Sequence, residues 1–203
     1  MSMEVKISKR RISYKTAVKI LYKRVEELKA NKGKELLWIL EHPLTYTAGI
    51  RSDDKEILDD KIKVIKTNRG GKITLHNPGQ KIIYFVLNLN NRKKDIRKLI
   101  GLIEKSIIEF LMIYKIKGKK DKKNIGIWVN EKKIAAIGLK ISKWVAYHGC
   151  SININNNLDD YLKIVPCGLN NQKITSVYNE KGIIIKNIEE KLKKIFIKNI
   201  SKI

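Results

Sequence analysis

The sequence predicts an α+β domain, in which helices bracket a sheet rich in hairpins. Three observations lead to this class. Apolar residues recur at helical spacing in three separate segments, short apolar runs typical of strands lie between those segments, and neither an internal repeat nor a linker divides the chain. Because 203 residues are enough for one domain with a sizeable core, we expect a single domain that spans residues 1–203.

The first third of the chain is expected to contain a helix and two strands. Over residues 14–32 apolar side chains fall three and four positions apart, and Gly33 follows the lysine-rich last turn as a helix stop. The continuous apolar run at 36–40 predicts a buried strand, and the alternation at 62–66 predicts an edge strand. Residues 51–60 are acidic and polar, and are expected to form a surface loop between these strands.

The rest of the chain gives five further elements, each marked by its own periodicity. They are a strand at 81–89, a helix that starts after the N-cap Asp95 and ends before Gly118, a hairpin with arms at 125–129 and 133–141, a strand at 144–154 interrupted at residues 148–150, and a last helix at 188–196. Gly138, inside the second arm of the hairpin, predicts either a bulge or the close approach of a ligand.

The chain is strongly basic, with a net charge of +24 and a pI near 9.9. Such a charge ordinarily indicates nucleic acid as the partner. Here lysine, isoleucine and asparagine dominate together, as they do when a coding sequence is rich in A and T, whatever the function. The lysines are also spread along the chain, without the interleaved aromatic residues of a nucleic-acid groove. We therefore interpret the charge as compositional first, and as an attraction for acidic protein partners second.

The sequence contains no segment that we interpret as a membrane span or a secretion signal. No apolar run approaches the roughly 20 residues that cross a bilayer, and the basic segment 1–11 is not followed by an apolar signal-peptide core. The two cysteines, Cys150 and Cys167, form no disulfide framework, so a reducing cytoplasm is the expected compartment. The histidines His42, His76 and His148 lack the spacing of metal ligands, and no metal site is expected.

Cys167 lies between a proline and a glycine, in the Val-Pro-Cys-Gly-Leu segment at 165–169. Proline fixes φ and lacks an N–H, whereas glycine adopts conformations closed to other residues. A cysteine on such a turn can project its sulfur clear of the backbone and leave room for a substrate, as a nucleophile requires. The alternative is that Cys167 is a small buried hydrophobe, as free cysteines usually are. This segment alone leaves both interpretations open.

Residues 69–80, Arg-Gly-Gly-Lys-Ile-Thr-Leu-His-Asn-Pro-Gly-Gln, combine paired glycines with a histidine and a Pro-Gly turn. Paired glycines let a ligand lie against the backbone, and Arg69 adds a fixed charge. The segment is neither a P-loop nor a dinucleotide fingerprint, because Gly-Lys-Ser/Thr and Gly-x-Gly-x-x-Gly are both absent. A Gly-Gly hairpin and an ordinary turn explain either half alone, but both features in one short segment favour a binding role.

Five spaced motifs can now be read together. In chain order they are Leu40-Glu41-His42-Pro43-x-x-Tyr46-Thr47-x-Gly49, Arg69-Gly70-Gly71-x-x-Thr74-x-His76-x-Pro78-Gly79-Gln80, Lys133-Ile134-Ala135-x-x-Gly138, His148-Gly149 and Pro166-Cys167-Gly168. This series resembles the lipoyl(octanoyl) transferases, the octanoyltransferases of lipoate biosynthesis, over about residues 14–180. The resemblance implies an acyltransferase with a fold like that of the biotin and lipoate protein ligases, a mixed β-sheet flanked by helices.

The resemblance also implies where the site lies. The catalytic cysteine of the family falls on Cys167 and its catalytic lysine on Lys133. The residues that bind the acyl group fall on three segments: Arg69, Gly70, Gly71, Lys72, Ile73, Thr74, Leu75 and His76; Ala136, Ile137 and Gly138; and Gly149, Cys150 and Ser151. The chain departs from the family at Asn77, where glycine is usual, and at Cys150, where a larger apolar residue is common. Because asparagine tolerates left-handed conformations, the turn at Asn77 is expected to survive.

The implied reaction opens a thioester and makes an amide, without ATP or any other cofactor. The octanoyl group passes from octanoyl-acyl carrier protein, through a thioester on Cys167, to a lysine of a lipoyl domain. A thiol with a pKa of about 8.5 is mostly protonated at neutral pH, so it needs the activation that the ammonium of a neighbouring Lys133 can give. We expect His76 to polarise or position the acyl carbonyl, with backbone N–H groups at the glycine turns as oxyanion donors.

The implied acceptors are the lipoyl domains of 2-oxoacid dehydrogenases and the glycine cleavage H protein. Two alternatives stay open. An ATP-dependent lipoate or biotin protein ligase has the same fold, but it makes an acyl-adenylate and needs no cysteine nucleophile such as Cys167. A basic nucleic-acid-binding module accounts for the charge but leaves the glycine-rich, His-Gly and Pro-Cys-Gly segments unexplained, so nucleic acid is not the expected partner.

Overall fold

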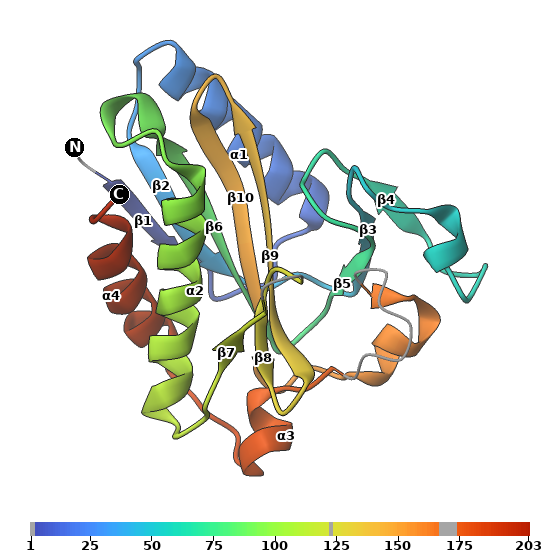
Figure 1. Ribbon diagram of the computed structural model, residues 1–203. Helices are drawn as coiled ribbons and strands as arrows, with labels where there is room; N and C mark the ends of the chain where they lie inside the picture. Colours follow the sequence, from blue (N-terminus) through green and yellow to red (C-terminus); the bar gives the residue numbers. More distant parts are fainter. Residues whose placement is uncertain (1–2, 122–123, 167–173) are drawn as a thin grey trace.

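The computed structural model describes residues 3–121, 124–166 and 174–203, and contains one sheet of seven strands and one of three (Figure 1). In chain order the described helices and strands are β1 (Met3–Ile7), α1 (Tyr14–Lys29), β2 (Glu35–Leu40), β3 (Thr45–Ala48), β4 (Val64–Lys66), β5 (Thr74–His76), β6 (Gln80–Asn88), α2 (Ile96–Ile113), β7 (Lys119–Lys120), β8 (Ile127–Val129), β9 (Lys132–Ser142), β10 (Val145–Asn153), α3 (Val177–Lys181) and α4 (Glu189–Ile200).

The seven-stranded sheet is mixed, with the strand order β1-β2-β6-β10-β9-β8-β7. β1 and β2 run parallel, whereas the other described pairs are antiparallel. Helix α1 packs on one face, and α2 and α4 pack on the other (Figure 1). Alternate residues of β2 therefore enter different cores: Leu36 and Trp38 pack under α1, and Leu37 and Ile39 under α2 and α4. The predicted α+β class, with a mixed sheet flanked by helices, is confirmed.

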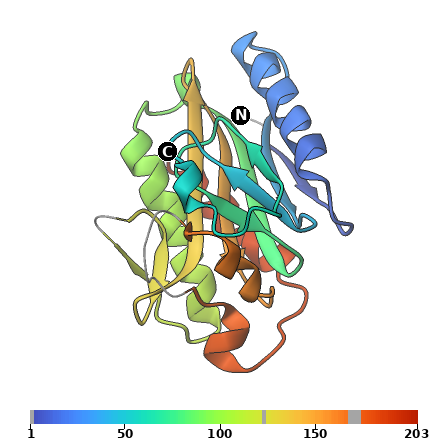
Figure 2. The same ribbon diagram turned by 90° about the vertical axis from the view of Figure 1, so that its right-hand side faces the viewer.

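The three-stranded sheet, β4-β3-β5, lies beside the large one and faces the viewer in Figure 2. β3 pairs in parallel with β4 and antiparallel with β5. Its small core joins Tyr46, Ile73 and Leu75 to Tyr161 and Ile164, which come from the chain shortly before the Pro-Cys-Gly segment. This core therefore fixes the glycine-rich segment 69–76 next to the chain that leads to Cys167.

The two long helices begin at side-chain caps. The Ser13 hydroxyl accepts the N–H of Thr16 at 3.2 Å, and the Asp95 carboxylate accepts the N–H of Lys98 at 2.8 Å, which confirms the predicted cap at Asp95. Helix α1 ends at Lys29, slightly earlier than expected. The cause is local, because the chain is already left-handed two residues later, at Asn31, with φ of +55°.

The predicted hairpin is present as β8 and β9. It turns at Asn130 and Glu131, whose φ values of +46° and +64° suit a tight two-residue connection. β9 pairs with β8 only as far as Ala135. Further along β9, the carbonyl oxygen of Leu139 accepts the N–H of Gly70 at 3.1 Å, so the glycine-rich segment lies against β9 beyond its pairing with β8.

Two sequence expectations need correction. Residues 3–7, considered above only as a basic terminal segment, form β1, and alternate side chains of this strand pack against the core. The expected interruption of the strand at residues 148–150 is wrong, since β10 pairs with β6 without a break from Val145 to Asn153. The strand instead contains one left-handed residue, His148, with φ of +67°. Within the described part of the chain, no helix combines the length and apolar character needed to cross a membrane.

Candidate active site

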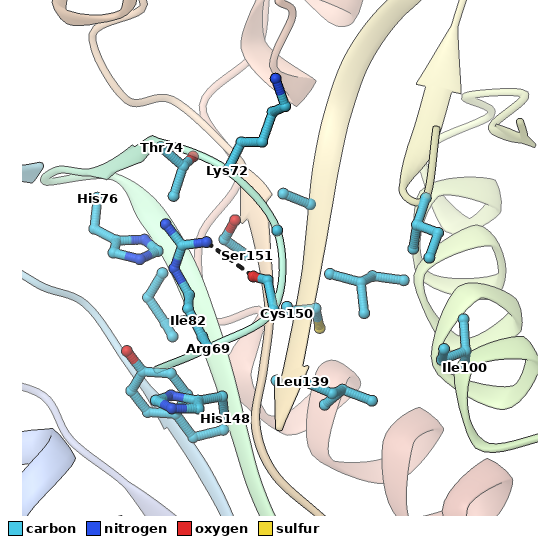
Figure 3. A pocket seen from close by; sticks show the side chains of 18 of the residues that line it. Arg69, Lys72, Thr74, His76, Ile82, Ile100, Leu139, His148, Cys150 and Ser151 are labelled. Carbon is cyan, nitrogen blue, oxygen red and sulfur yellow. Dashed lines mark hydrogen bonds between the residues drawn. The ribbon is translucent and has the colours of Figure 1, made fainter. Parts of the chain in front are cut away.

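A cavity of about 420 Å³ lies between the large sheet and the glycine-rich segment. All but two of the expected acyl-binding residues line it, namely Arg69, Gly70, Gly71, Lys72, Thr74, His76, Ala136, Ile137, Gly138, Gly149, Cys150 and Ser151. Ile73 and Leu75 do not, because their side chains are buried in the core of the small sheet. The fold thus brings three distant segments of the sequence to one cavity, which Figure 3 shows from close by.

The floor of the cavity is a stretch of sheet in which β9 and β10 carry small residues in two adjacent rows. Two rows cross β9, β10 and β6 in register: Ala136–Ser151–Ile82 and Gly138–Gly149–Tyr84. A Cβ atom at Gly149 would lie 1.9 Å from the carbonyl oxygen of Ile83, and one at Gly138 would lie 3.3 Å from that of Gly70. For Gly138 the sequence predicted a bulge or the close approach of a ligand; the register with Gly149 is regular, and the near neighbour is the protein backbone at Gly70.

The turn at residues 69–71 covers this floor. Its conformation needs glycine, because Gly71 has φ of +89°. The guanidinium of Arg69 donates from Nη2 to the carbonyl and hydroxyl oxygens of Thr47, at 2.8 and 2.9 Å. Arg69 is only 8% exposed, so a positive charge is fixed within the cavity wall (Figure 3). Such a preorganised charge stabilises the negative oxygen that develops when a thioester carbonyl is attacked.

The three histidines of the chain, distant in sequence, meet beside this cavity. The ring centroids of His42 and His76 are 5.5 Å apart, and His76 and His148 line the cavity. Burial lowers the pKa of His42 and of His148 to about 4, and that of His76 to about 3, so all three rings are neutral at pH 7. Among the described residues, no group of three or more His, Cys, Asp and Glu side chains is arranged to hold a metal ion.

The hydrogen bonds of His76 define its role more narrowly than the sequence did. The Gln80 amide donates from Nε2 to Asn153 and Tyr161, which turns its oxygen toward His76 Nδ1, at 2.8 Å. The proton of the neutral ring is therefore on Nδ1, and Nε2 carries a lone pair. Such a ring cannot donate a hydrogen bond to an acyl carbonyl. The expected polarising role of His76 thus conflicts with this geometry, which leaves a role in positioning.

Lys133 is buried in the cavity wall, with 6% of its surface exposed. β9 carries one extra residue, Ile134, before its register with β8 resumes. This bulge turns Lys133 toward the face that carries the cavity floor, and its Nζ lies 5.4 Å from the centre of the Trp128 ring. Lys132, one residue earlier, pairs with Val129, which belongs to the core under α2. The two neighbouring lysines therefore lie on opposite faces of the sheet.

The expected nucleophile, Cys167, lies outside the described residues. The described chain on both sides of it is tied to the site. On one side, the N–H of Val165 donates to the carbonyl oxygen of Glu56 at 2.7 Å, and the carboxylate of Glu56 pairs with the ammonium of a cavity lysine at 2.6 Å. On the other side, the N–H of Thr175 donates to the carbonyl oxygen of Lys133 itself, at 3.0 Å.

Cys150, the cysteine that the structure describes, is chemically different from a nucleophile. It lies on β10, is 4% exposed and belongs to the core under α2 and α4. Burial raises the pKa of its thiol, which therefore stays protonated at neutral pH. Cys150 borders the cavity as a small apolar residue.

Several residues that the sequence did not single out complete the site. Tyr14, at the start of α1, and Tyr84, on β6, line the cavity near the histidines. Asn68 accepts the Nε2–H of His148 and donates to the hydroxyl of Tyr147, both at 3.1 Å. No local pattern marks these residues, because their contacts at the site are with residues distant in the sequence.

The departure at Asn77 is accommodated in a way that the sequence did not predict. Asn77 is not left-handed; the positive φ of this turn, +86°, is at Gly79. The Asn77 amide instead donates to the carbonyl oxygen of Asn157 at 2.7 Å and to the carboxylate of Asp160 at 2.9 Å. The turn survives because these bonds hold the buried side chain of Asn77 in place.

Known proteins are similar to this chain in sequence or in fold. The sequence model of the lipoyl protein ligase A/B catalytic domain matches residues 13–197. An octanoyltransferase of Bartonella tribocorum is 41% identical over 191 residues, which cover 87% of this chain and 78% of that protein. An octanoyltransferase of Wolbachia pipientis wMel is 42% identical over 199 residues, which cover 95% of this chain and 97% of that protein.

Two solved structures are similar in fold. A lipoate-protein ligase A bound with ATP has a TM-score of 0.72 at 15% identity, with 98% of this chain and 85% of that chain covered. The bipartite lipoate protein ligase of Thermoplasma acidophilum has a TM-score of 0.70 at 14% identity, with 99% and 84% covered. At such low identity, these structures show the fold and nothing about the substrates of this chain.

Proposed function

This chain belongs to the lipoyl protein ligase A/B catalytic-domain family and is an octanoyltransferase of lipoate biosynthesis, and we propose that it transfers the octanoyl group through a thioester on Cys167. In the first step the Cys167 thiolate attacks the thioester carbonyl of the donor. A new C–S bond forms at Cys167, the carrier thiolate leaves, and it takes up a proton. In the second step a lysine amine attacks the acyl-enzyme, so that an amide forms, the C–S bond breaks and Cys167 leaves as the thiolate.

The observation that carries this proposal is the burial of Lys133 in the cavity wall, together with the hydrogen bond from Thr175 to its carbonyl oxygen. Thr175 follows Cys167 by eight residues, so the described chain on the C-terminal side of the proposed nucleophile is bonded to the proposed activating lysine. An ammonium beside a thiol favours the thiolate and can protonate the leaving carrier thiol. Lys133 then accepts a proton from the attacking amine.

We also propose the partners and the setting of the reaction. The donor is octanoyl-acyl carrier protein, and the acceptors are the lipoyl domains of 2-oxoacid dehydrogenases and the glycine cleavage H protein. Residues 1–203 act as one catalytic domain, in the cytoplasm, without a cofactor. The net charge of +24 speeds the encounter with acidic partners by electrostatic steering.

A direct comparison of donors tests the proposal against the ATP-dependent alternative. The enzyme is incubated with a lipoyl domain and either octanoyl-acyl carrier protein or octanoate plus Mg-ATP, and the lipoyl domain is weighed by mass spectrometry. We expect octanoyl-lysine with the carrier-bound donor alone. Modification that requires octanoate and ATP would show a ligase and would contradict the thioester route.

A further inference from the structure

The cavity floor ends at a wall on one side. Beyond the rows of Ala136 and Gly138, the next row across the sheet is Lys140–Tyr147–Val86, in which Lys140 and Tyr147 take the places that small residues hold on β9 and β10 in the two floor rows. In Figure 3, His148 lies at this end of the group of labelled residues, whereas Lys72 and Thr74 lie at the other, with Arg69 between them. The floor is therefore open along the small residues and closed at the level of His148.

The backbone of His148 places its ring in this wall. Alternation along β10 sends Ala146 and Cys150 into the core under α2, and would send His148 there as well. Its φ of +67° turns the ring to the opposite face, where it packs on Tyr147 with ring centroids 4.9 Å apart. The ring centroid of Tyr22, on α1, lies 6.5 Å from that of His148 on the outer side. Tyr22 is 39% exposed whereas His148 is buried, so Tyr22 lies between His148 and solvent.

The wall is also held rigidly and without charge. Asn68 accepts the Nε2–H of His148 and donates to Tyr147, so a single amide fixes both rings. Asn68 directly precedes Arg69, which links the wall to the glycine-rich turn above the floor. A neutral, immobilised aromatic wall suits contact with the end of an apolar chain.

The distance to this wall matches the substrate. The Nζ atom of Lys133 lies 3.4 Å from the point that a Cβ atom of Gly126 would occupy, and that point lies 2.6 Å from the carbonyl oxygen of Ala135, so the ammonium is at the level of Ala135 and Ala136. Leu139, which pairs with His148, is three positions further along β9 than Ala136. At the spacing of a strand this separation is about 10 Å. The seven C–C bonds of an octanoyl chain, each about 1.5 Å long and in zigzag, span about 9 Å. A chain held by its carbonyl at the Lys133 end therefore reaches the level of His148 with its terminal methyl group.

We infer that His148, with Tyr147 behind it, is the end wall of the acyl channel and sets the preference for eight carbons. This inference rests on the proposed function, because it places the acyl carbonyl beside Lys133. A chain of twelve carbons is excluded because it would have to displace the His148 ring. The competing location for the tail is the part of the cavity that Ile100 of α2 and Leu139 of β9 line (Figure 3).

The substitution His148→Gly removes the ring at a position whose positive φ glycine adopts without strain. We compare kcat/KM for octanoyl- and dodecanoyl-carrier protein in the wild type, in His148→Gly and in Ile100→Ala. Each methylene newly buried contributes about 0.8 kcal/mol, or about fourfold, so the C12/C8 ratio should rise at least tenfold in His148→Gly. Ile100→Ala should leave this ratio at the wild-type value.

Three results would overturn the inference. The first is an unchanged C12/C8 ratio in a His148→Gly enzyme that still uses the octanoyl donor, and the second is a shift of this ratio in Ile100→Ala alone. The third is the loss of all transfer in a folded His148→Gly enzyme, because a residue of the end wall touches no reacting atom. If His148→Gly does not fold, His148→Asn replaces it, because asparagine tolerates the same φ with a shorter side chain, and the ratio should move in the same direction. If the wild type uses no acyl-carrier donor, it is the proposed function that fails.

Discussion

The three buried histidines predict that this protein loses stability in mild acid. Folding depresses the pKa of His42 and His148 from 6.5 to about 4, and that of His76 to about 3, chiefly because burial penalises the charged ring. A depressed pKa means that the unfolded chain binds protons that the folded chain does not. The stabilising contribution is therefore present in full above pH 6.5, and it is lost as the pH falls from 6.5 toward 4.

The size of the effect follows from these values. With a folded pKa of about 4, one histidine lowers the free energy of unfolding by about 2 kcal/mol between pH 7.5 and pH 5.0. The chain has three histidines, all in this cluster, so the loss is on the order of 5 kcal/mol. A domain of this size has a total stability of about 5–15 kcal/mol, and the loss is thus a large part of it.

Urea unfolding, followed by tryptophan fluorescence at a series of pH values, measures this loss. In the variant His42→Gln the amide can replace both ring contacts, the one to the carbonyl oxygen of Ile12 and the one to the hydroxyl of Tyr84. The variant has one titrating ring fewer, so its stability should fall by about a third less between pH 7.5 and 5.0. A wild-type stability that stays flat over this range would refute the reasoning, as would a variant that keeps the full slope.

Two further predictions concern the floor and the wall of the cavity. Gly149→Ala brings a Cβ atom to 1.9 Å from a carbonyl oxygen of β6 and should lower the free energy of unfolding by at least about 3 kcal/mol. The control Gly101→Ala, in helix α2, places its Cβ atom 3.9 Å from the nearest neighbour and should leave the free energy of unfolding unchanged or raise it by up to about 1 kcal/mol. Equal unfolding midpoints of the two variants would contradict this. Lys133→Met should lower the rate of acyl transfer about 100-fold and move the midpoint of Cys167 alkylation by iodoacetamide to higher pH, because the ammonium that favours the thiolate is lost. A Lys132→Met enzyme with the same defects would show that Lys133 is not the activator.

The elements that the sequence predicted well are those with local causes. The cap of α2 is local, because the Asp95 carboxylate accepts the N–H of Lys98, only three residues further along the chain. The hairpin is local as well, because its two strands are joined by the short turn at Asn130. The strand β1 was missed because its pairing with β2 is parallel and reaches across α1. Its alternation is also diluted by the basic residues around it.

The site shows the same division. The glycine-rich segment and the Lys-Ile-Ala segment could be found by motif, since each is continuous in the sequence. The contact of Asn68 with His148 could not, because it joins residues 80 positions apart. Gln80 is only four residues from His76, but the direction of its amide depends on Asn153 and Tyr161, which are distant in the sequence. The inward turn of His148 has a further cause that no periodicity shows, a single left-handed residue inside a regular strand.

The central claim is that Cys167 carries the octanoyl group, and the mass of the intact protein tests it most directly. The enzyme is incubated with octanoyl-acyl carrier protein without an acceptor and weighed before and after hydroxylamine, which cleaves thioesters. We expect one octanoyl adduct on the wild type and on Cys150→Ser, removed by hydroxylamine, and none on Cys167→Ser. An adduct that persists in Cys167→Ser, or one that maps to Cys150, would contradict the account.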